Sequence, residues 1–182
     1  LTYTGDDTSG YTTRVAIIDT DNGTQLGATG TFVGSWSSYV QFNAAGNRIT
    51  VITDTQSTDT DPATTELSVY DAATGAQGGS TLTFTGDTWT GATVDDDPSR
   101  VIVYTASATS STVTAVDLLT ATRLGSTLTL PGEAWSTYRS DDSSRVVVAS
   151  LTGNGTTTKV ATLQIGEATG APFNGSVTVD DV

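Results

Sequence analysis

The residues of this chain that could do chemistry are almost all carboxylates. The sequence holds 20 acidic and 7 basic residues, has a net charge of −13, and contains no histidine, cysteine or methionine. This composition excludes a Ser-His-Asp or Cys-His nucleophile, and it removes the nitrogen and sulfur ligands that transition metals use. Calcium is the one metal ion that the oxygen ligands of this chain could hold.

Two acidic stretches are candidates for such a cation site. The first is "DTQSTDTDPATTE" at residues 54–66, where Asp59, Asp61 and Glu66 could bind calcium. A solvated polar loop is the favoured alternative, because acids without a rigid frame bind cations weakly. The second is the triplet at residues 95–97 in "VDDDPSR". Its proline and serine favour a tight acidic turn that leads into a strand.

Three aspartates recur before turn residues, and each could begin a calcium loop: Asp19, Asp71 and Asp117. An EF-hand-like loop needs further oxygen ligands at fixed offsets, and Gln25 and Leu26 do not supply them after the first aspartate. We therefore predict Asx turns at these sites. In such turns a glycine takes a positive φ angle, and the candidates are Gly23, Gly75 and Gly170.

Three tryptophans also recur in phase, at Trp36, Trp89 and Trp135. A row of aromatic side chains on one face could bind a sugar or a peptide. The favoured alternative is packing between neighbouring repeats, which suits large aromatic side chains. The candidate binding surface consists of these tryptophans with Asp59, Asp61 and Glu66.

The elements that must position these residues are internal repeats. "VYDAATGAQGGSTLTFTGDTW" from residue 69 matches "AVDLLTATRLGSTLTLPGEAW" from residue 115, and looser copies begin at residues 17 and 163. The anchoring aspartates lie 52 and 46 residues apart, and Gly166 takes the aspartate's place in the fourth copy. Each copy predicts four strands. The first starts at the tryptophan, the second starts at an arginine, the third ends at the aspartate, and the fourth is the "GSTLTF" run. The arginines are Arg48, Arg100 and Arg145.

Two-fold alternation of apolar residues, with threonine at roughly a fifth of the chain, predicts an all-β fold. Four short antiparallel strands per repeat of this length are typical of a β-propeller blade. We expect a single propeller segment over residues 1–182, with four consecutive four-stranded blades at 1–34, 35–87, 88–133 and 134–182. The first blade lacks its innermost strand, so we expect a part of a larger propeller or contact with another chain at the open flank.

The segment "TVTAVDLLTATRLGSTLTLPGEAWSTYRSDDSSRVVVAS" resembles the YVTN-type propeller repeat of surface-layer and other secreted prokaryotic proteins. That family has a "V-D-x-x-T-G" turn, a "P-W" or similar entry and a "S-P-D-G-x-R-V-Y-V" hairpin. Here "DDPS", "DDSS" and "AAGN" stand in place of "SPDG". The resemblance covers nearly the whole chain and implies a propeller with an extracellular or cell-surface location. It implies no particular activity, because propellers serve many functions.

These observations predict a non-enzymatic binding or structural module with no catalytic residue and no cofactor. Two alternatives stay open. One is a fragment of a lactonase-like or quinoprotein-like propeller enzyme whose catalytic residues lie outside this segment. The other is a structural subunit that assembles through open strand edges. The expected partner is a protein, a carbohydrate, a further copy or further blades of a parent chain. The acidic charge opposes nucleic acid, and no apolar run is long enough for membrane insertion.

Overall fold

The structure, a computed structural model, describes residues 2–6, 10–33, 38–55, 62–86, 99–107, 109–139, 145–152, 157–164 and 180–181. Within these ranges the regular secondary structure is entirely β-strand. The described part accordingly contains no helix that could cross a bilayer. The prediction of an all-β chain is confirmed.

The strands form four antiparallel sheets in chain order. Sheet 1 contains β1 (Thr2–Asp6), β2 (Gly10–Ile18) and β3 (Gln25–Val33). Sheet 2 contains β4 (Ser38–Phe42), β5 (Arg48–Thr55), β6 (Thr64–Asp71) and β7 (Gln77–Thr85). Sheet 3 contains β8 (Arg100–Ala106), β9 (Ser110–Asp117) and β10 (Thr122–Pro131). Sheet 4 contains β11 (Glu133–Arg139), β12 (Arg145–Thr152), β13 (Thr157–Gln164) and β14 (Asp180–Asp181).

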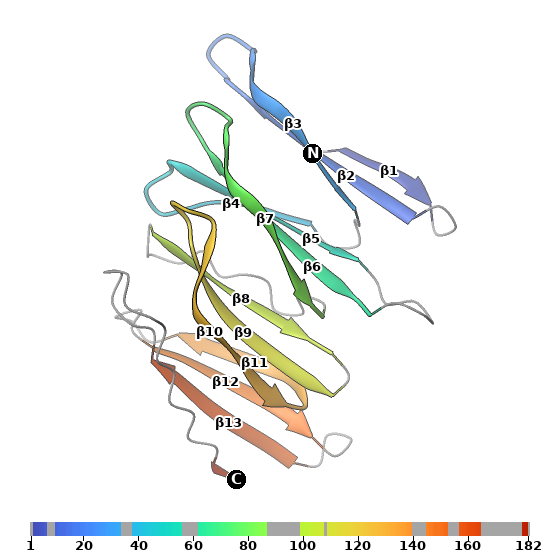
Figure 1. The fold of residues 1–182 in the computed structure, drawn as a ribbon, viewed down its shortest axis with the longest axis vertical. Coiled ribbons are helices and arrows are strands. Elements are labelled where there is room, and N and C mark those ends of the chain that lie inside the picture. Colours follow the sequence, from blue (N-terminus) through green and yellow to red (C-terminus); the bar gives the residue numbers. More distant parts are fainter. Residues whose placement is uncertain are drawn as a thin grey trace.

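The sheets follow one another along the longest axis of the molecule, with sheet 1 at one end and sheet 4 at the other (Figure 1). The last strand of each sheet lies against the next sheet: β3 against β5, β7 against β8 and β10 against β12. The described strands do not close into a ring. The strand that we expected after Trp89 falls outside the described ranges.

The register of the strands defines equivalent positions in the sheets. In sheets 2 and 3, the arginine that opens one strand lies opposite the aspartate that ends the next: Arg48 opposite Asp71, and Arg100 opposite Asp117. In sheet 4, Arg145 lies opposite Gln164. The place of the aspartate in the fourth copy therefore belongs to Gln164. Our assignment of Gly166 to that place is wrong, because the fourth copy has no aspartate to anchor the alignment.

Apolar side chains fill the spaces between consecutive sheets, where their burial supplies the main stabilising term. The cluster between sheets 1 and 2 contains Val15, Phe32, Ile49, Val51 and Tyr70. The cluster between sheets 2 and 3 contains Ile52, Leu67, Val69, Phe84, Val101, Val103, Val116, Leu118 and Ala121. The cluster between sheets 3 and 4 contains Ile102, Tyr104, Val113, Ala115, Leu130, Val146 and Val148. Strands β5 and β8 lie between two sheets, which explains why both of their faces are buried.

A backbone contact at a glycine bulge locks sheet 1 onto sheet 2, and an equivalent contact locks sheet 2 onto sheet 3. In β3, Gly27 has a φ angle of 66°, and a Cβ there would lie only 2.2 Å from the carbonyl oxygen of Gly75 in the β6–β7 turn. In β7, Gly79 has a φ angle of 73°, and its Cβ would lie 2.6 Å from the carbonyl oxygen of Thr120 in the β9–β10 turn. Both the φ angle and the close approach demand glycine. The turn of one sheet thus fits into the bulge of the preceding sheet.

Candidate functional site

The structure describes only part of the predicted binding surface. Four of its residues lie outside the described ranges: Trp36, Trp89, Asp59 and Asp61. The acidic turn at residues 95–97 lies outside them as well. Trp135 belongs to β11, and Glu66 belongs to β6. Glu66 is thus the predicted site residue whose side-chain surroundings are described.

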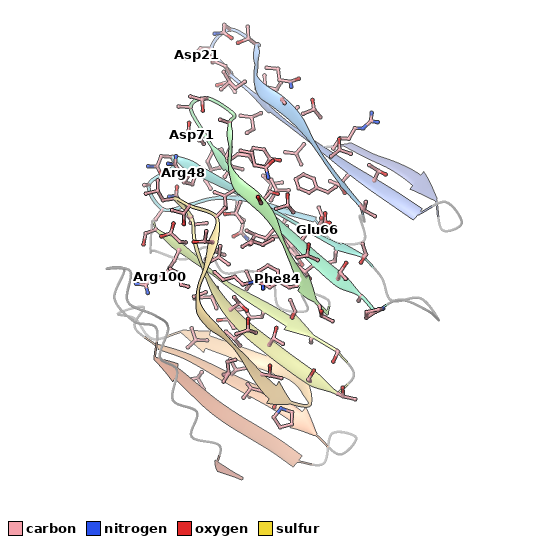
Figure 2. The ribbon with its side chains drawn as sticks, viewed as in Figure 1. Asp21, Arg48, Glu66, Asp71, Phe84 and Arg100 are labelled. Atoms are coloured by element: carbon pink, nitrogen blue, oxygen red, sulfur yellow. The ribbon has the colours of Figure 1, made fainter. Side chains whose placement is uncertain are left out.

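Glu66 lies opposite Thr53 across β5 and β6, on the face of sheet 2 that packs against sheet 1 (Figure 2). Burial raises the pKa of the Glu66 carboxyl group. The Thr53 hydroxyl is fully buried, and no described residue accepts or donates a hydrogen bond to it. A buried hydroxyl without a partner costs stability, and such costs are concentrated at functional sites.

Asp54 occupies the opposite face of the same strand end, toward sheet 3. Its side chain is only 4% exposed, and it lies opposite Thr65. The Thr65 hydroxyl is 2.7 Å from the Asp54 carboxylate and 2.8 Å from the carbonyl oxygen of Gly86. A hydroxyl has one proton, so two acceptors compete for one donor here. We call Thr53, Asp54, Thr65 and Glu66 the Asp54 cluster.

Two threonines close the strand ends next to this cluster. The hydroxyls of Thr55 and Thr64 lie 2.7 Å apart, and the backbone N–H of Thr64 donates to the Thr55 hydroxyl at 3.0 Å. Residues 56–63, with two of the predicted ligands, connect these threonines in the sequence. The paired ends of β5 and β6 therefore flank that segment in the sequence.

The equivalent end of sheet 3 is neutral and its hydroxyls are paired. Thr105, the counterpart of Thr53, donates to the carbonyl oxygen of Thr85 at 2.8 Å and lies 2.6 Å from the Thr112 hydroxyl. Ser111, the counterpart of Thr65, donates to the carbonyl oxygen of Gly132 at 2.8 Å. Ala106 stands where sheet 2 has a buried aspartate. The carboxylates are thus specific to sheet 2 rather than a requirement of the fold.

Asp54 was not predicted as a site residue. The available signal was the alignment of "RITVITDT" with "RVIVYTAS", in which Asp54 replaces Ala106 in an otherwise apolar or threonine-rich strand. Burial of that position became evident only when β5 was placed between two sheets.

The aspartates of the recurring turns lie at the opposite ends of their strands, where β2, β6 and β9 finish, and Figure 2 labels Asp71 there. Each caps its turn through a side-chain oxygen that accepts the backbone N–H two residues later: Asp19 from Asp21, Asp71 from Ala73, and Asp117 from Leu119. These are the predicted Asx turns. Gly23 and Gly75 have positive φ angles as expected, whereas Gly170 lies outside the described ranges.

Asp71 also forms an ion pair. Its carboxylate accepts a hydrogen bond from the Arg48 guanidinium at 2.5 Å. Hydrogen bonds from the Thr74 hydroxyl and backbone N–H, together with Arg48, hold the pKa of Asp71 below its usual range. Because this carboxylate is committed to its turn and to the arginine, it serves the structure at this end of the sheet.

The two ends of sheet 2 therefore offer different chemistry. At the turn end the carboxylate is matched by N–H, hydroxyl and guanidinium donors. At the other end, the Thr65 hydroxyl lies near two acceptors, and no described residue pairs with the Thr53 hydroxyl. Within the described ranges, no three acidic side chains converge as a metal-binding group. The partly exposed Glu66 carboxylate can accept a hydrogen bond from a ligand that brings its own donors.

No family model matches the chain, and no curated protein matches it. Among solved structures, a chain described as "Crystal structure of the eukaryotic initiation factor" is similar over 98% of this chain, with 9% sequence identity and a TM-score of 0.46. The alignment covers 50% of that chain, so the present chain spans half of its length. Similarity at this level identifies neither a family nor a function.

Proposed function

We propose that this chain is a segment of a β-propeller and acts as a non-enzymatic binding module of a secreted or cell-surface protein. Four consecutive antiparallel meanders, joined by a repeated bulge-and-turn contact, support the propeller interpretation. The phase of the arginine and aspartate positions supports equivalent blades in sheets 2 and 3. The strongly acidic composition suits an extracellular setting.

The observation that carries the binding role is the Asp54 cluster. Sheet 2 buries a carboxylate and leaves a hydroxyl unpaired at positions where sheet 3 has an alanine and a paired threonine. A fold gains no stability from this exchange, so a role in recognition accounts for it. The cluster also adjoins the connection at residues 56–63, and connecting segments carry binding residues more often than the scaffold does.

The ligand class that fits this cluster is carbohydrate. Carboxylate and hydroxyl oxygens accept hydrogen bonds, and sugars present many hydroxyl donors. Glu66 and the threonines at the strand ends are partly exposed, and the buried Asp54 holds Thr65 in place behind them. This arrangement requires no nucleophile, in keeping with a binding function.

A screen of labelled chain against immobilised glycans, followed by calorimetry, tests the proposal. We expect binding that Glu66→Gln weakens roughly tenfold or more, because this variant removes a charged acceptor. Asp54→Asn should weaken binding less, because the buried Asp54 acts through its hydrogen bond with Thr65 and not by contact with the ligand. Asp117→Asn, at the turn end of sheet 3, is the matched control and should bind as the parent does. Absence of glycan binding, or equal affinity of Glu66→Gln and the parent, would contradict the proposal. Calcium binding that the same variants abolish would instead assign the cluster to a cation.

A further inference from the structure

The turn between β2 and β3 contains an asparagine that is followed by a glycine, Asn22 and Gly23. The backbone nitrogen of a residue can attack the side-chain amide of a preceding asparagine. Glycine favours this attack because it has no side chain to shield its nitrogen and because its backbone is conformationally free. In the part of the chain that the structure describes, the other two asparagines, Asn43 and Asn47, precede an alanine and an arginine. Asn22 is therefore the described amide whose neighbour favours such a reaction.

Water reaches the position of Asn22 in each of the three equivalent turns. Asn22 is exposed, and so are its counterparts Thr74 in sheet 2 and Thr120 in sheet 3. The turns of these two threonines contact the glycine bulge of the preceding sheet. Exposure of this position therefore persists when a preceding sheet covers the turn.

Hydrogen bonds hold the Asn22 amide in one orientation. Its Oδ1 accepts hydrogen bonds from the backbone N–H of Thr24 at 2.9 Å and from the Thr24 hydroxyl at 2.6 Å. Its Nδ2 donates to the Asp19 carboxylate at 2.9 Å. Two donors thus lie where negative charge would develop if a nucleophile added to the amide carbon, and donors at such a position stabilise that charge.

The turn does not require an asparagine at this position. In sheet 2 the Thr74 hydroxyl donates to the Asp71 carboxylate at 2.9 Å, and in sheet 3 the Thr120 hydroxyl donates to the Asp117 carboxylate at 2.9 Å. A threonine hydroxyl therefore caps the turn in the same way as the Asn22 amide. The reactive amide of sheet 1 is an addition to the common scaffold.

We propose that Asn22 is a self-modification site, at which the turn promotes loss of ammonia from the amide. The Gly23 N–H leaves the Asp19 carbonyl oxygen, to which it donates at 2.8 Å, and gives its proton to hydroxide from the solvent. The nitrogen then bonds to Cγ of Asn22, and the charge on Oδ1 is stabilised by the two donors of Thr24. The Cγ–Nδ2 bond breaks, Nδ2 takes a proton from water and leaves as ammonia, and a succinimide ring remains. Water opens this ring at either carbonyl group and yields aspartate or isoaspartate, so water is the only co-reactant.

The product should weaken the turn. An aspartate at position 22 has no N–H group to donate to Asp19, and it places a second carboxylate where the amide nitrogen now lies 2.9 Å from the first. Like charges at such a separation repel each other, and isoaspartate also lengthens the backbone of the turn. The reaction is thus a slow, irreversible change at the β2–β3 turn. It does not depend on the proposed carbohydrate binding, because Glu66 belongs to sheet 2.

Mass spectrometry of the full chain, incubated at mildly alkaline pH, tests the proposal. A single tryptic peptide, residues 15–48, contains Asn22, Asn43 and Asn47, so the latter two are internal references. We expect conversion of the amide to the acid at Asn22 before either reference, with isoaspartate detected by enzymatic methylation. Thr24→Val should slow the conversion roughly twofold to tenfold, which corresponds to the loss of one net hydrogen bond. Thr24→Ser keeps the hydroxyl and should react at close to the parent rate.

Asn22→Thr is the matched control for the turn, because it introduces the residue that sheets 2 and 3 have there. Amide hydrogen exchange at residues 19–24 should rise during incubation of the parent and stay constant in this variant. Three results would overturn the proposal. The first is an Asn22 amide that survives incubation as long as the two references do. The second is equal conversion in Thr24→Val and the parent. The third is faster conversion in the urea-unfolded chain than in the folded chain, which would mean that the turn protects the amide.

Discussion

Strands β5, β6 and β7 of sheet 2 and strands β8, β9 and β10 of sheet 3 have the same order, and β5–β6 and β8–β9 have equivalent register, yet the buried polar positions differ. Near the β8–β9 connection of sheet 3, the hydroxyls of Thr105 and Ser111 form hydrogen bonds with a backbone carbonyl or with another hydroxyl. At the corresponding end of β5 and β6, sheet 2 has a buried aspartate, a partly buried glutamate and an unpaired threonine. Because the scaffold is common to both sheets, the difference isolates what sheet 2 has acquired beyond the needs of folding.

The sheets also differ at the turn that enters the preceding bulge. Sheet 2 has Gly75 there with a φ angle of 68°, and sheet 3 has Ala121 with a φ angle of 52°. The methyl group of Ala121 lies in the apolar cluster between sheets 2 and 3, where it is 3% exposed. A methyl group at Gly75 would instead run into the backbone of Leu26. The same turn thus tolerates a side chain in one sheet and excludes it in the other.

Gly75→Ala should have the largest effect on the free energy of unfolding. A positive φ angle costs an alanine about 1 to 2 kcal/mol, and the overlap with the Leu26 carbonyl forces sheets 1 and 2 apart. We expect a loss of about 3 kcal/mol in urea denaturation. Ala121→Gly, the matched change in sheet 3, should alter stability by less than about 1 kcal/mol, because relief of strain offsets the lost methyl group. Equal effects of the two variants would refute the difference between the turns.

Removal of the hydroxyl of Thr105 and removal of that of its counterpart Thr53 should change the free energy of unfolding in opposite directions. Thr105→Val deprives the Thr85 carbonyl oxygen and the Thr112 hydroxyl of a partner, and we expect a loss of about 1 to 2 kcal/mol. Thr53→Val removes a buried hydroxyl without a described partner, and we expect a gain of about 1 kcal/mol. Thermal unfolding of both variants beside the parent chain measures the difference. A loss of stability in Thr53→Val would reveal a partner for that hydroxyl.

Thr50→Val should increase the free energy of unfolding by a smaller amount. Thr50 is 1% exposed with no described hydrogen-bond partner, and its counterpart in sheet 3 is Ile102. Valine has the same shape, so the expected gain of roughly 0.5 to 1 kcal/mol comes from the hydroxyl alone. Thr114→Val is the control, because the Thr114 hydroxyl lies 2.8 Å from that of Thr127 and its removal should not stabilise the chain. Similar shifts for both variants in chemical denaturation would argue against an unpaired Thr50.

Glu66→Gln should have the smallest effect and the clearest dependence on pH. The pKa of Glu66 is raised in the folded chain. Its stabilising contribution is therefore complete below the unfolded carboxyl pKa and is lost as the pH rises through the folded value. Glutamine cannot ionise, so the variant should be more stable than the parent at neutral pH, by a few tenths of a kcal/mol after solvent screening.

Asp71, in the same sheet, should change the free energy of unfolding with pH in the opposite direction. Its folded pKa is lowered, so its contribution is present above the unfolded carboxyl pKa and is lost as the pH falls through the folded value. Asp71→Asn should therefore destabilise the chain at neutral pH and have less effect in acid. Unfolding midpoints measured from acid to neutral pH should separate the two variants. Parallel pH profiles for Glu66→Gln and the parent chain would contradict the raised pKa.

Local residue chemistry made much of the fold predictable. The arginines and aspartates that flank the apolar runs mark the ends of β5, β6, β8 and β9 within about a residue of the structure. Aspartate before glycine or threonine predicted the Asx turns, because a short carboxylate caps its own turn without help from distant residues. The fourth copy has no aspartate at this position. The sequence alignment therefore assigned Gly166 to the place that the strand register gives to Gln164.

The candidate site was harder to predict because its unusual feature is burial of polar groups. Asp54 reads in the sequence as the first residue of a polar connection. Its 4% exposure results from sheet 3, whose strands begin some 45 residues later in the sequence. The missing partner of Thr53 likewise depends on how sheet 1 packs. Glu66 was identified because acidic side chains were sought directly, whereas no local pattern distinguishes a paired threonine from an unpaired one.

The bulge-and-turn contact also separates the part of each repeat that can vary from the part that cannot. Gly27 and Gly75 belong to different repeats but are in contact. A substitution at one of these positions therefore requires a compatible residue at the other, and the two positions should co-vary among related sequences. The β5–β6 connection joins β6 at Thr64, the end of the strand that is remote from that contact. Its length and composition can therefore diversify during evolution while the stacking of the sheets stays the same.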